Sequence, residues 1–307
     1  MSEIALAIHG GAGPIGRDRL DAEQARVARD ALHRTLRAGH DALISGASAL
    51  DAVELAVSML EEEPSFNAGR GSALTAMGQV AMDAAIADGR TRSAGAVAGV
   101  ERLVHPISAA RLVMEQSPHV LLIGVHAETF AREHGADVAD PSYFITEPQR
   151  EELARERAKA GTRSKGDETC GGTVGAVARD ANAHLAAATS TGGMTNQLPG
   201  RIGDTPLIGA GSWADDATCA VSGTGHGEAF IRCGFAHEVD ALIRLRELGI
   251  EAACQSALSR VTALGSTGGC IAVGPTGPAF LGFTSIGMYR GRIGEDGEPR
   301  AAIFADE

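Results

Sequence analysis

An abrupt change of character near the middle of the chain limits what this sequence can fold into. Residues 147–168 are polar and poor in apolar side chains, whereas Thr173 opens the run Thr-Val-Gly-Ala-Val-Ala, which is typical of a buried strand. A polar linker that ends at Gly172–Thr173 fits an internal cleavage site whose new first residue is threonine. The same pattern fits a glycine loop followed by a strand that begins with a β-branched residue.

A threonine at a chain terminus carries its own general base. Its α-amino group titrates near about 8 and lies next to the hydroxyl, from which it can take a proton. Thr173 is therefore the candidate nucleophile, and Gly172–Thr173 is the candidate cleavage site. Thr191 follows at the end of a second predicted strand. If the two strands form a hairpin, Thr191 returns to Thr173 and can hydrogen-bond its hydroxyl; otherwise Thr191 is an ordinary polar strand end.

Two residues of opposite charge follow in the segment 199–204. Arg201 has a guanidinium that can bind a carboxylate through two hydrogen bonds, and Asp204 has a carboxylate that can bind an ammonium group. Together they can clamp the two charged groups of an α-amino acid. The alternative is a surface ion pair on a loop, which is a common and weak arrangement.

Two glycine-rich segments each follow a predicted strand. Gly223–Gly227 (GTGHG) also opens a predicted helix, where backbone N–H groups stabilise negative charge, either the oxyanion of a tetrahedral intermediate or a phosphate. The chain has no GxxxxGK[ST] motif, which disfavours the phosphate. His226 is interpreted as a pocket-wall residue, because a terminal threonine needs no second base. The segment 9–13 (HGGAG) fits a phosphate loop or a tight turn.

Composition excludes several classes of function. The 307 residues carry a net charge of −12, which disfavours nucleic acid and anionic membranes as partners. No apolar run approaches the length of a membrane span, and the first residues do not resemble a signal peptide, so we expect a cytoplasmic protein. The five cysteines form no CxxC pair and the ten histidines lack metal-ligand spacing, so neither a disulfide framework nor a zinc site is predicted.

Hydrophobic periodicity predicts strands and helices on both sides of the polar segment. Helices are expected over 20–44, 48–62, 106–116, 127–133, 228–248 and 251–264, with a solvated helix at most over 149–160. Ser48, with Asp51 three residues later, is the expected cap of the second helix. Strands are expected over 4–8, 80–87, 94–100, 120–123, 174–178, 185–189, 219–222, 270–273 and 279–283. This order fits packed sheets whose outer faces are covered by helices.

Eight segments, taken in order, resemble the plant-type L-asparaginase/isoaspartyl peptidase family of N-terminal-nucleophile hydrolases, and the resemblance covers nearly the whole chain. Their order and spacing carry the resemblance, since each segment alone is short. The segments are 7–13 (AIHGGAG), 66–71 (FNAGRG), 82–84 (MDA), 95–100 (GAVAGV), 172–177 (GTVGAV), 189–194 (TSTGGM), 200–204 (GRIGD) and 224–228 (TGHGE).

The resemblance implies an α+β fold, a four-layer αββα sandwich, built as a single domain over 1–307. It also implies that the chain cleaves itself between Gly172 and Thr173. The products are 1–172, with a C-terminal linker over about 140–172, and 173–307. The two chains would remain associated, and two such pairs would form a dimer.

The resemblance further implies roles for individual residues. The implied catalytic residues are Thr173 as nucleophile, Thr191 as its hydroxyl partner, and Thr224 and Gly225 as the oxyanion site. Arg201 is implied to hold the α-carboxylate of the substrate and Asp204 its α-amino group. The implied substrate-binding set is Asn67, Arg201, Asp204, Thr224, Gly225 and Gly227. No cofactor is expected to be required, but a structural sodium ion is implied at the backbone carbonyls of Leu60, Glu61, Glu63, Phe66, Ala68 and Arg70.

The expected activity is hydrolysis of β-aspartyl (isoaspartyl) dipeptides and L-asparagine, which releases L-aspartate. One alternative is an aspartylglucosaminidase-like amidase with a sugar leaving group. Such enzymes usually carry an acid before the threonine, where this chain has Gly172, and Trp213 is the only tryptophan that can stack on a sugar. The other alternative is an uncleaved, catalytically silent α/β protein that binds an anion at its glycine loops.

Overall fold

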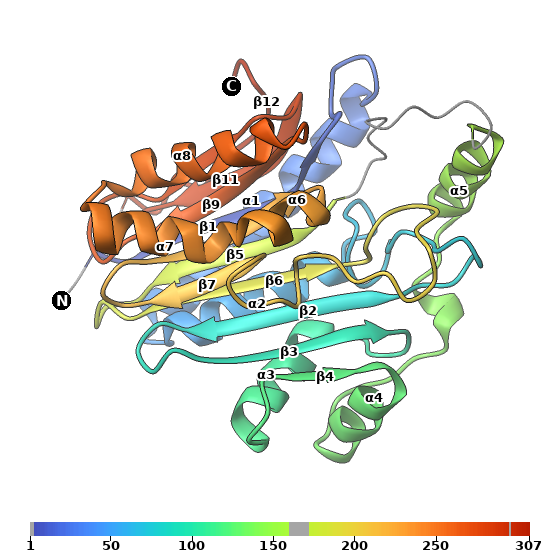
Figure 1. The fold of residues 1–307 in the computed structure, drawn as a ribbon, viewed down its shortest axis with the longest axis horizontal. Helices are drawn as coiled ribbons and strands as arrows, with labels where there is room; N and C mark the ends of the chain where they lie inside the picture. The colour runs from blue at the N-terminus through green and yellow to red at the C-terminus, as the bar shows by residue number, and fades with distance from the viewer. Residues whose placement is uncertain (1–2, 160–171, 295) are drawn as a thin grey trace.

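The computed structural model describes residues 3–159, 172–294 and 296–307, which form two sheets with helices on their outer faces (Figure 1). Cys170 and the last part of the predicted linker lie outside these residues. The order of layers is helices, sheet, sheet, helices, so the predicted α+β class and the αββα sandwich are confirmed.

The larger sheet has eight strands, and the chain enters one of its central strands directly after Gly172. Neighbouring strands are antiparallel, except for β3 and β4, which are parallel. The strand order is β12 (Arg300–Phe304), β11 (Gly287–Ile293), β1 (Ala5–Gly13), β5 (Val174–Arg179), β6 (Leu185–Thr191), β2 (Met82–Asp88), β3 (Ser93–Val100) and β4 (Leu121–Ile123).

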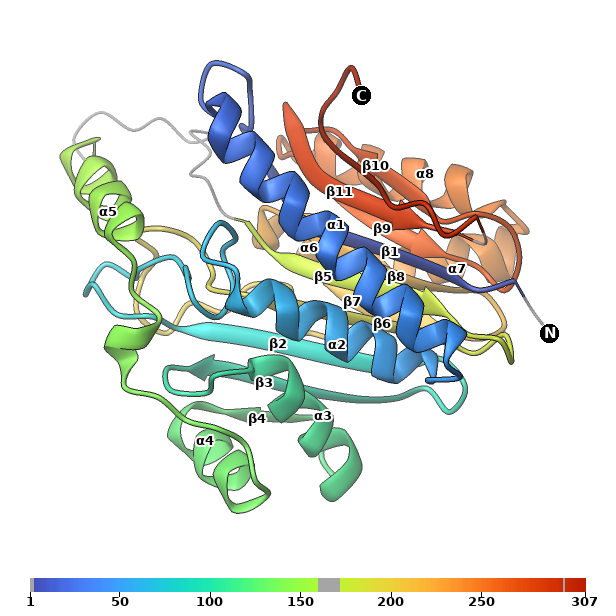
Figure 2. The ribbon, with the colours of Figure 1, turned by 180° about the vertical axis from the view of Figure 1, so that it is seen from behind.

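The smaller sheet has four antiparallel strands, in the order β10 (Phe280–Phe283), β9 (Gly268–Val273), β8 (Cys219–Gly225) and β7 (Ser212–Asp215). Helices α7 and α8 cover its outer face in Figure 1, and α1, α2 and α3 cover the outer face of the larger sheet in Figure 2. The helices are α1 (Ala22–Ile44), α2 (Ala49–Glu62), α3 (Pro106–Gln116), α4 (Gly124–Glu133), α5 (Glu147–Lys159), α6 (Gly227–Cys233), α7 (Phe235–Arg246) and α8 (Ile250–Ala263), with a 3-10 turn at Pro141–Tyr143.

Three apolar layers hold the sandwich together, and strand alternation separates them. In β5, Val174, Ala176 and Ala178 face the helices of the larger sheet, whereas Val177 packs in the layer between the sheets. A third cluster joins β8 and β9 to α6, α7 and α8. The layer between the sheets is rich in alanine, and such short side chains allow the two backbones to approach closely. This close approach brings polar groups of one sheet within reach of the other.

Several helix boundaries follow from local chemistry. The predicted Ser48 cap is confirmed, since the Ser48 hydroxyl accepts from the Asp51 N–H and the Asp51 carboxylate accepts from the Ser48 N–H. Helix α5, expected at most as a solvated helix, spans Glu147–Lys159 and is mostly exposed. The helix expected over 228–248 is wrong as a single element, because Gly234 at φ 57° ends α6 and a second helix begins after it.

Strands β7, β11 and β12 were not predicted. The first and last are short, and β11 carries Arg290 and Arg292 where a buried strand would show apolar residues. The segment 9–13 is neither a phosphate loop nor a turn, because it continues β1 through a bulge between His9 and Gly11. In the part of the chain that the structure describes, no helix combines the length and apolar character that crossing a membrane requires.

Candidate active site

The predicted hairpin of β5 and β6 brings Thr173 and Thr191 together. Val174 pairs with Ser190, so Thr173 lies beside the end of β6. The Thr173 hydroxyl donates a hydrogen bond to Thr191 Oγ1 over 3.2 Å, and both side chains are buried. The geometry expected from the hairpin is therefore present, and the Thr173 hydroxyl has a fixed position at the start of a central strand.

Two donors converge on the carbonyl of Gly172, just before Thr173. Asn67 Nδ2 donates to this oxygen over 2.8 Å and the Thr191 hydroxyl over 3.1 Å. The amide of Asn67 is itself oriented, because its Nδ2 also donates to the Gly193 carbonyl over 2.7 Å and its Oδ1 accepts from the Ala73 N–H over 2.6 Å. A carbonyl with two fixed donors is polarised and can accumulate negative charge.

Strand β1 closes the other side of the junction. A side chain at Gly11, whose φ is +113°, would place its Cβ 2.7 Å from Gly172 Cα and 3.1 Å from Thr173 N. Only glycine allows this approach, which explains Gly11. Its role is to admit the Gly172–Thr173 peptide, and the sequence pattern alone did not distinguish that role from a turn.

His9 anchors the backbone of Thr173 from the interior and was not predicted as a site residue. Its Nδ1 lies 2.8 Å from the Thr173 carbonyl oxygen and its Nε2 lies 2.8 Å from Ser222 Oγ. Burial lowers the pKa of His9 to about 3, so the ring is neutral at physiological pH. A carbonyl only accepts, so Nδ1 carries the proton and Nε2 accepts from Ser222, whose oxygen is 2.7 Å from Thr189 Oγ1. The chain of hydrogen bonds crosses from one sheet to the other.

The two residues of the predicted clamp lie near Thr173 but do not form an ion pair with each other. Arg201 instead forms a two-pronged ion pair with Glu228, at 3.0 Å for both nitrogens, and its Nη1 donates to Gln197 Oε1 over 3.3 Å. Glu228 is partly exposed, whereas Asp204 is buried. The alternative of a simple surface pair between Arg201 and Asp204 is therefore wrong.

Asp204 is a buried carboxyl group with an unsatisfied atom. Its Oδ2 has no hydrogen-bond partner among the described residues, and desolvation by burial raises the pKa of Asp204 to about 6. Asp83 lies behind it and accepts from the Gly99 N–H over 2.9 Å, and burial raises the pKa of Asp83 to about 7. A buried oxygen without a donor is costly in the folded state, and an ammonium group can satisfy it.

Three residues of the segment 223–227 contribute in different ways. Gly225, at φ +153°, lines the same cavity as Thr173. A Cβ at Gly227 would lie 2.9 Å from both Arg201 Nη2 and Asp204 Oδ1, so glycine is required for the clamp to assemble. Thr224 does not line the cavity in the described structure, and its Oγ1 accepts from the Ala12 N–H over 3.2 Å. Its predicted oxyanion role would require that hydroxyl or its neighbouring backbone to turn toward Thr173.

A cavity of about 10 Å³ joins the nucleophile to the clamp. This volume is close to that of a single water molecule and far below the several hundred Å³ of a ligand site. Gly172, whose carbonyl accepts from Asn67 and Thr191, lies beside the threonine. The lining residues are Thr173, Thr191, Gly193, Met194, Arg201, Gly203, Asp204, Thr205 and Gly225.

The loop predicted to bind sodium contains carbonyl groups that fit a cation. Phe66 and Ala68 are buried, and their carbonyls accept no hydrogen bond from any described residue. Gly71, at φ +105°, has room for no Cβ, because one would lie 2.7 Å from the Pro64 oxygen and 2.8 Å from the Phe66 oxygen. Leu60, Glu61 and Glu63 carbonyls already accept from Glu63, Arg70 and Phe66 N–H groups, respectively, and so offer only their second lone pairs.

Comparison with known proteins agrees with the fold. The sandwich with a threonine at the start of a central strand is the architecture expected of an N-terminal-nucleophile hydrolase. The sequence model of the family described as asparaginase matches residues 2–303, and the chain belongs to this family.

Three relatives illustrate the similarity. The isoaspartyl peptidase of Salmonella typhimurium is 48% identical over 298 residues, covering 94% of this chain and 95% of that protein. The isoaspartyl peptidase of Escherichia coli is 44% identical over 314 residues, covering 100% and 98%. The human isoaspartyl peptidase/L-asparaginase is 41% identical over 288 residues, covering 94% and 92%.

Proposed function

We propose that this protein is a threonine amidohydrolase that cleaves β-aspartyl dipeptides and L-asparagine, after cutting its own chain at Gly172–Thr173. The observation that carries the proposal is the placement of the Thr173 hydroxyl, Arg201 and Asp204 around one cavity. Relatives that match nearly the full chain bear the names isoaspartyl peptidase and L-asparaginase, which supports the same reaction.

The hydrogen bonds of the junction suggest a route for self-cleavage. Thr173 Oγ1 attacks the Gly172 carbonyl carbon, and its proton can pass through the Thr191 hydroxyl to the former carbonyl oxygen, since Thr173 donates to Thr191 and Thr191 donates to Gly172 O. Asn67 Nδ2 stabilises charge on that oxygen. The C–N bond then breaks as the proton on the former carbonyl oxygen passes to the nitrogen and the ester carbonyl forms. Water hydrolyses this ester to give a Gly172 carboxylate and a free Thr173 amine.

Once the amine is free, the same hydroxyl can attack a substrate. The α-amino group of Thr173 takes the hydroxyl proton as Oγ1 adds to the side-chain carbonyl of an aspartyl group, and then gives the proton to the leaving amine. A β-aspartyl ester remains on Thr173. Water, deprotonated by the same amine, hydrolyses the ester and releases L-aspartate. Thr191 keeps the nucleophile oriented, and Gly225, which lines the same cavity, is the candidate backbone donor to the developing oxyanion.

The clamp explains the choice of a β-linked aspartyl group. Only an aspartate joined through its side chain keeps both its α-amino and its α-carboxylate group free. Arg201 can exchange its exposed partner Glu228 for the substrate carboxylate, and the buried Asp204 can accept from the substrate ammonium.

We also propose that Phe66 and Ala68 carbonyls, with others of the loop 60–70, hold a structural sodium ion, and that two cleaved pairs associate. Sodium would order the loop that carries Asn67.

The proposed activity is tested by free aspartate released from three peptides. β-Asp-Leu should be hydrolysed. α-Asp-Leu, which lacks the free α-carboxylate for Arg201, and acetyl-β-Asp-Leu, which lacks the free amine for Asp204, should not be, because each loses one of the two charged contacts of the clamp. L-Asparagine serves as the second substrate. Comparable release from all three peptides would show that Arg201 and Asp204 do not recognise the α-carbon substituents and would overturn the assignment.

A further inference from the structure

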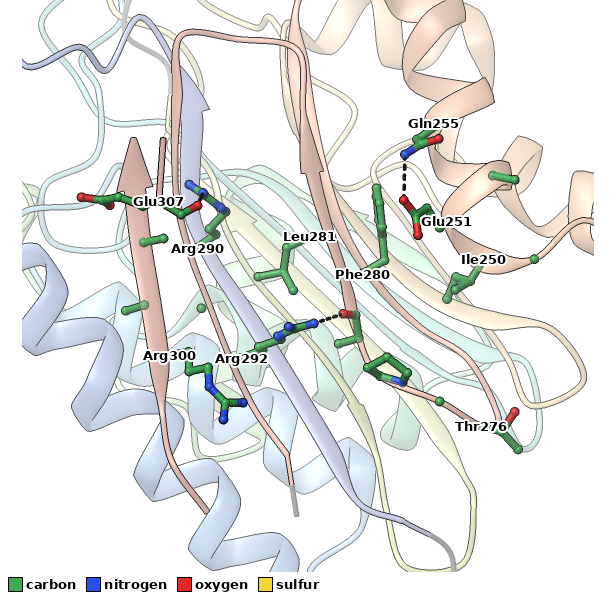
Figure 3. A pocket seen from close by; sticks show the side chains of 18 residues that line it. Ile250, Glu251, Gln255, Thr276, Phe280, Leu281, Arg290, Arg292, Arg300 and Glu307 are labelled. Carbon is green, nitrogen blue, oxygen red and sulfur yellow. Dashed lines mark hydrogen bonds between the residues drawn. The ribbon is translucent and has the colours of Figure 1, made fainter. Parts of the chain in front are cut away.

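The two sheets differ in width, and this difference leaves a second cavity, whose lining residues differ from those of the Thr173 cavity. The smaller sheet ends at β10, so the inner faces of β11 and β12 extend beyond it. A cavity of about 1050 Å³ lies there, between β10, the start of α8 and the strands β11 and β12 (Figure 3). We call it the β10–β11 cleft. It is large enough for a small organic ligand and shares no residue with the Thr173 cavity.

One wall of the cleft carries three arginines. Arg290 and Arg292 lie two residues apart on β11 and therefore on one face of the sheet, and Arg300 of β12 pairs directly with Arg292. Like charges directly opposite each other on neighbouring strands destabilise a sheet. In a chain with a net charge of −12, such a pairing points to a binding role for the positive charge.

The charges of these arginines are unequally compensated. Arg300 has an ion pair with Asp296. Arg290 is buried and donates to the carbonyls of Phe304 and Glu307, over 3.1 and 2.9 Å. Arg292 is exposed and donates to the Ala279 carbonyl over 3.1 Å, and it has no acidic partner among the described residues. Arg292 therefore has donors available for an anion.

The facing wall of the cleft is apolar. Leu281 of β10 lies beside Arg290 and Arg292 in Figure 3, whereas its neighbour Phe280, on the other face of the strand, points toward α8. Pro278 and Ile250 also line this side of the cleft. The acidic residue on this side, Glu251, accepts from Gln255 Nε2 over 3.0 Å. A ligand that satisfies both walls needs an apolar part and a single negative end. A guanidinium binds a carboxylate with two parallel hydrogen bonds.

We propose that the β10–β11 cleft binds a small amphipathic carboxylate, with the carboxylate between Arg292 and Arg300 and the apolar part against Leu281 and the edge of β10. This ligand is distinct from the aspartyl substrate, which carries two charged ends and no apolar body. The proposal does not depend on the activity assigned to Thr173, because the two cavities have no residue in common.

The probes are octanoate, 1-octanol and octylammonium, whose binding to the purified full-length protein is measured by isothermal titration calorimetry. Octanoate should bind, and the other two should bind at least about tenfold more weakly, because neither pairs with a guanidinium. Arg292→Ala should weaken octanoate binding about tenfold or more. Arg246→Ala, which removes an exposed arginine at the end of α7, is the matched control and should leave binding unchanged.

A second variant tests the cavity without removing a charge. Ala302 lines the cleft opposite Arg290, and Ala302→Phe should narrow the cleft beside the arginines and weaken octanoate binding while β-Asp-Leu hydrolysis continues. Equal binding of octanoate and 1-octanol, or equal octanoate binding by Arg292→Ala and the control, would overturn the proposal. A third outcome would also overturn it: the wild type does not bind octanoate, and Arg292→Ala changes the protein from dimer to monomer. The cleft would then be a contact between two copies.

Discussion

At the Gly172–Thr173 junction the polar atoms meet partners within the protein, whereas the clamp across the same cavity is incomplete. The Gly172 carbonyl has two donors, the Thr173 hydroxyl has an acceptor and the Thr173 carbonyl is bonded to His9. Asp204, in contrast, has a buried oxygen with no partner, and Arg201 is paired with a partly exposed Glu228. The junction is arranged for a reaction within the chain, while the clamp requires a ligand.

The difference assigns separate groups to the two reactions. Self-cleavage should depend on Thr173, Thr191 and Asn67 and be indifferent to the clamp. Hydrolysis should need both sets. Glu228 is partly exposed, so water weakens its ion pair with Arg201 and a substrate carboxylate can replace it at little cost. Substitutions that affect one reaction but not the other test this assignment directly.

The largest expected effect belongs to the nucleophile. Thr173→Ala should leave one full-length chain and no hydrolysis, because the hydroxyl that attacks Gly172 is gone. Thr173→Ser keeps a hydroxyl and should still be cut. Intact mass spectrometry checks both, and the wild type should give fragments 1–172 and 173–307. A Thr173→Ala protein that is cleanly cut at this bond would show that another group performs the reaction.

Asn67→Asp should slow self-cleavage by about 10²–10³-fold, the usual effect of losing one oxyanion donor. Aspartate matches asparagine in size and retains an oxygen for the Ala73 N–H, but it offers no N–H to Gly172 O. The rate is read from the decay of full-length chain on denaturing gels. Asn182→Asp, on the exposed β5–β6 turn, is the control for the added charge. Equal cleavage rates for the two variants would exclude Asn67 from the oxyanion site.

Clamp variants should show the opposite behaviour. Arg201→Ala and Asp204→Ala should be cut like the wild type, yet lose β-Asp-Leu hydrolysis. Removing one partner of a buried charged hydrogen bond costs about 2–5 kcal/mol, or roughly 30- to several-thousand-fold. Arg232→Ala, an exposed arginine of α6, serves as control. Activity within about twofold of the control would show that Arg201 and Asp204 have no role in hydrolysis. If the variants were not cut, the residues for self-cleavage and those for substrate binding would not be separate groups.

The sequence was sufficient for those parts of the fold that have local signals. The Ser48 cap, the strand run after Thr173 and the spacing of Thr191 are all local, and each appears as predicted. Strand β11 was missed because its arginines face a cleft and break the apolar pattern that marks a buried strand. The break between α6 and α7 depends on one glycine, Gly234, whose φ is positive.

Within the site, the residues that sequence reasoning missed act through contacts between residues distant in the sequence. His9 bonds Ser222 of the other sheet, which lies 213 residues away, and Glu228 of α6 pairs with Arg201 over 27 residues. No periodicity or motif spacing reports such contacts, because they depend on how the elements pack in space. Asp83, in contrast, carried a usable signal, since it sits in β2 directly opposite Thr191 and is an acid in an otherwise buried apolar strand.

The smallest expected effect is a pH dependence of ligand binding, which tests the unsatisfied carboxyl group of Asp204. Burial raises the pKa of Asp204 from 3.8 to about 6, so Asp204 gains a proton as the pH falls from 7 to 5. A protonated Asp204 no longer attracts an ammonium group. Over this range the α-carboxylate of L-aspartate, which titrates near about 3.5, and its ammonium keep their charges, and the terminal amine of Thr173 stays protonated.

The dissociation constant of L-aspartate for the cut enzyme should therefore rise about tenfold for each pH unit below 6, measured by calorimetry at fixed ionic strength. Asp204→Asn should bind weakly at every pH and lose the inflection. Asp83→Asn is the matched control: burial raises the pKa of Asp83 to about 7, but Asp83 does not line the cavity, so the inflection near 6 should remain. An inflection that follows Asp83 would assign the pH dependence to the residue behind the clamp, and a flat profile would mean that Asp204 is ionised throughout.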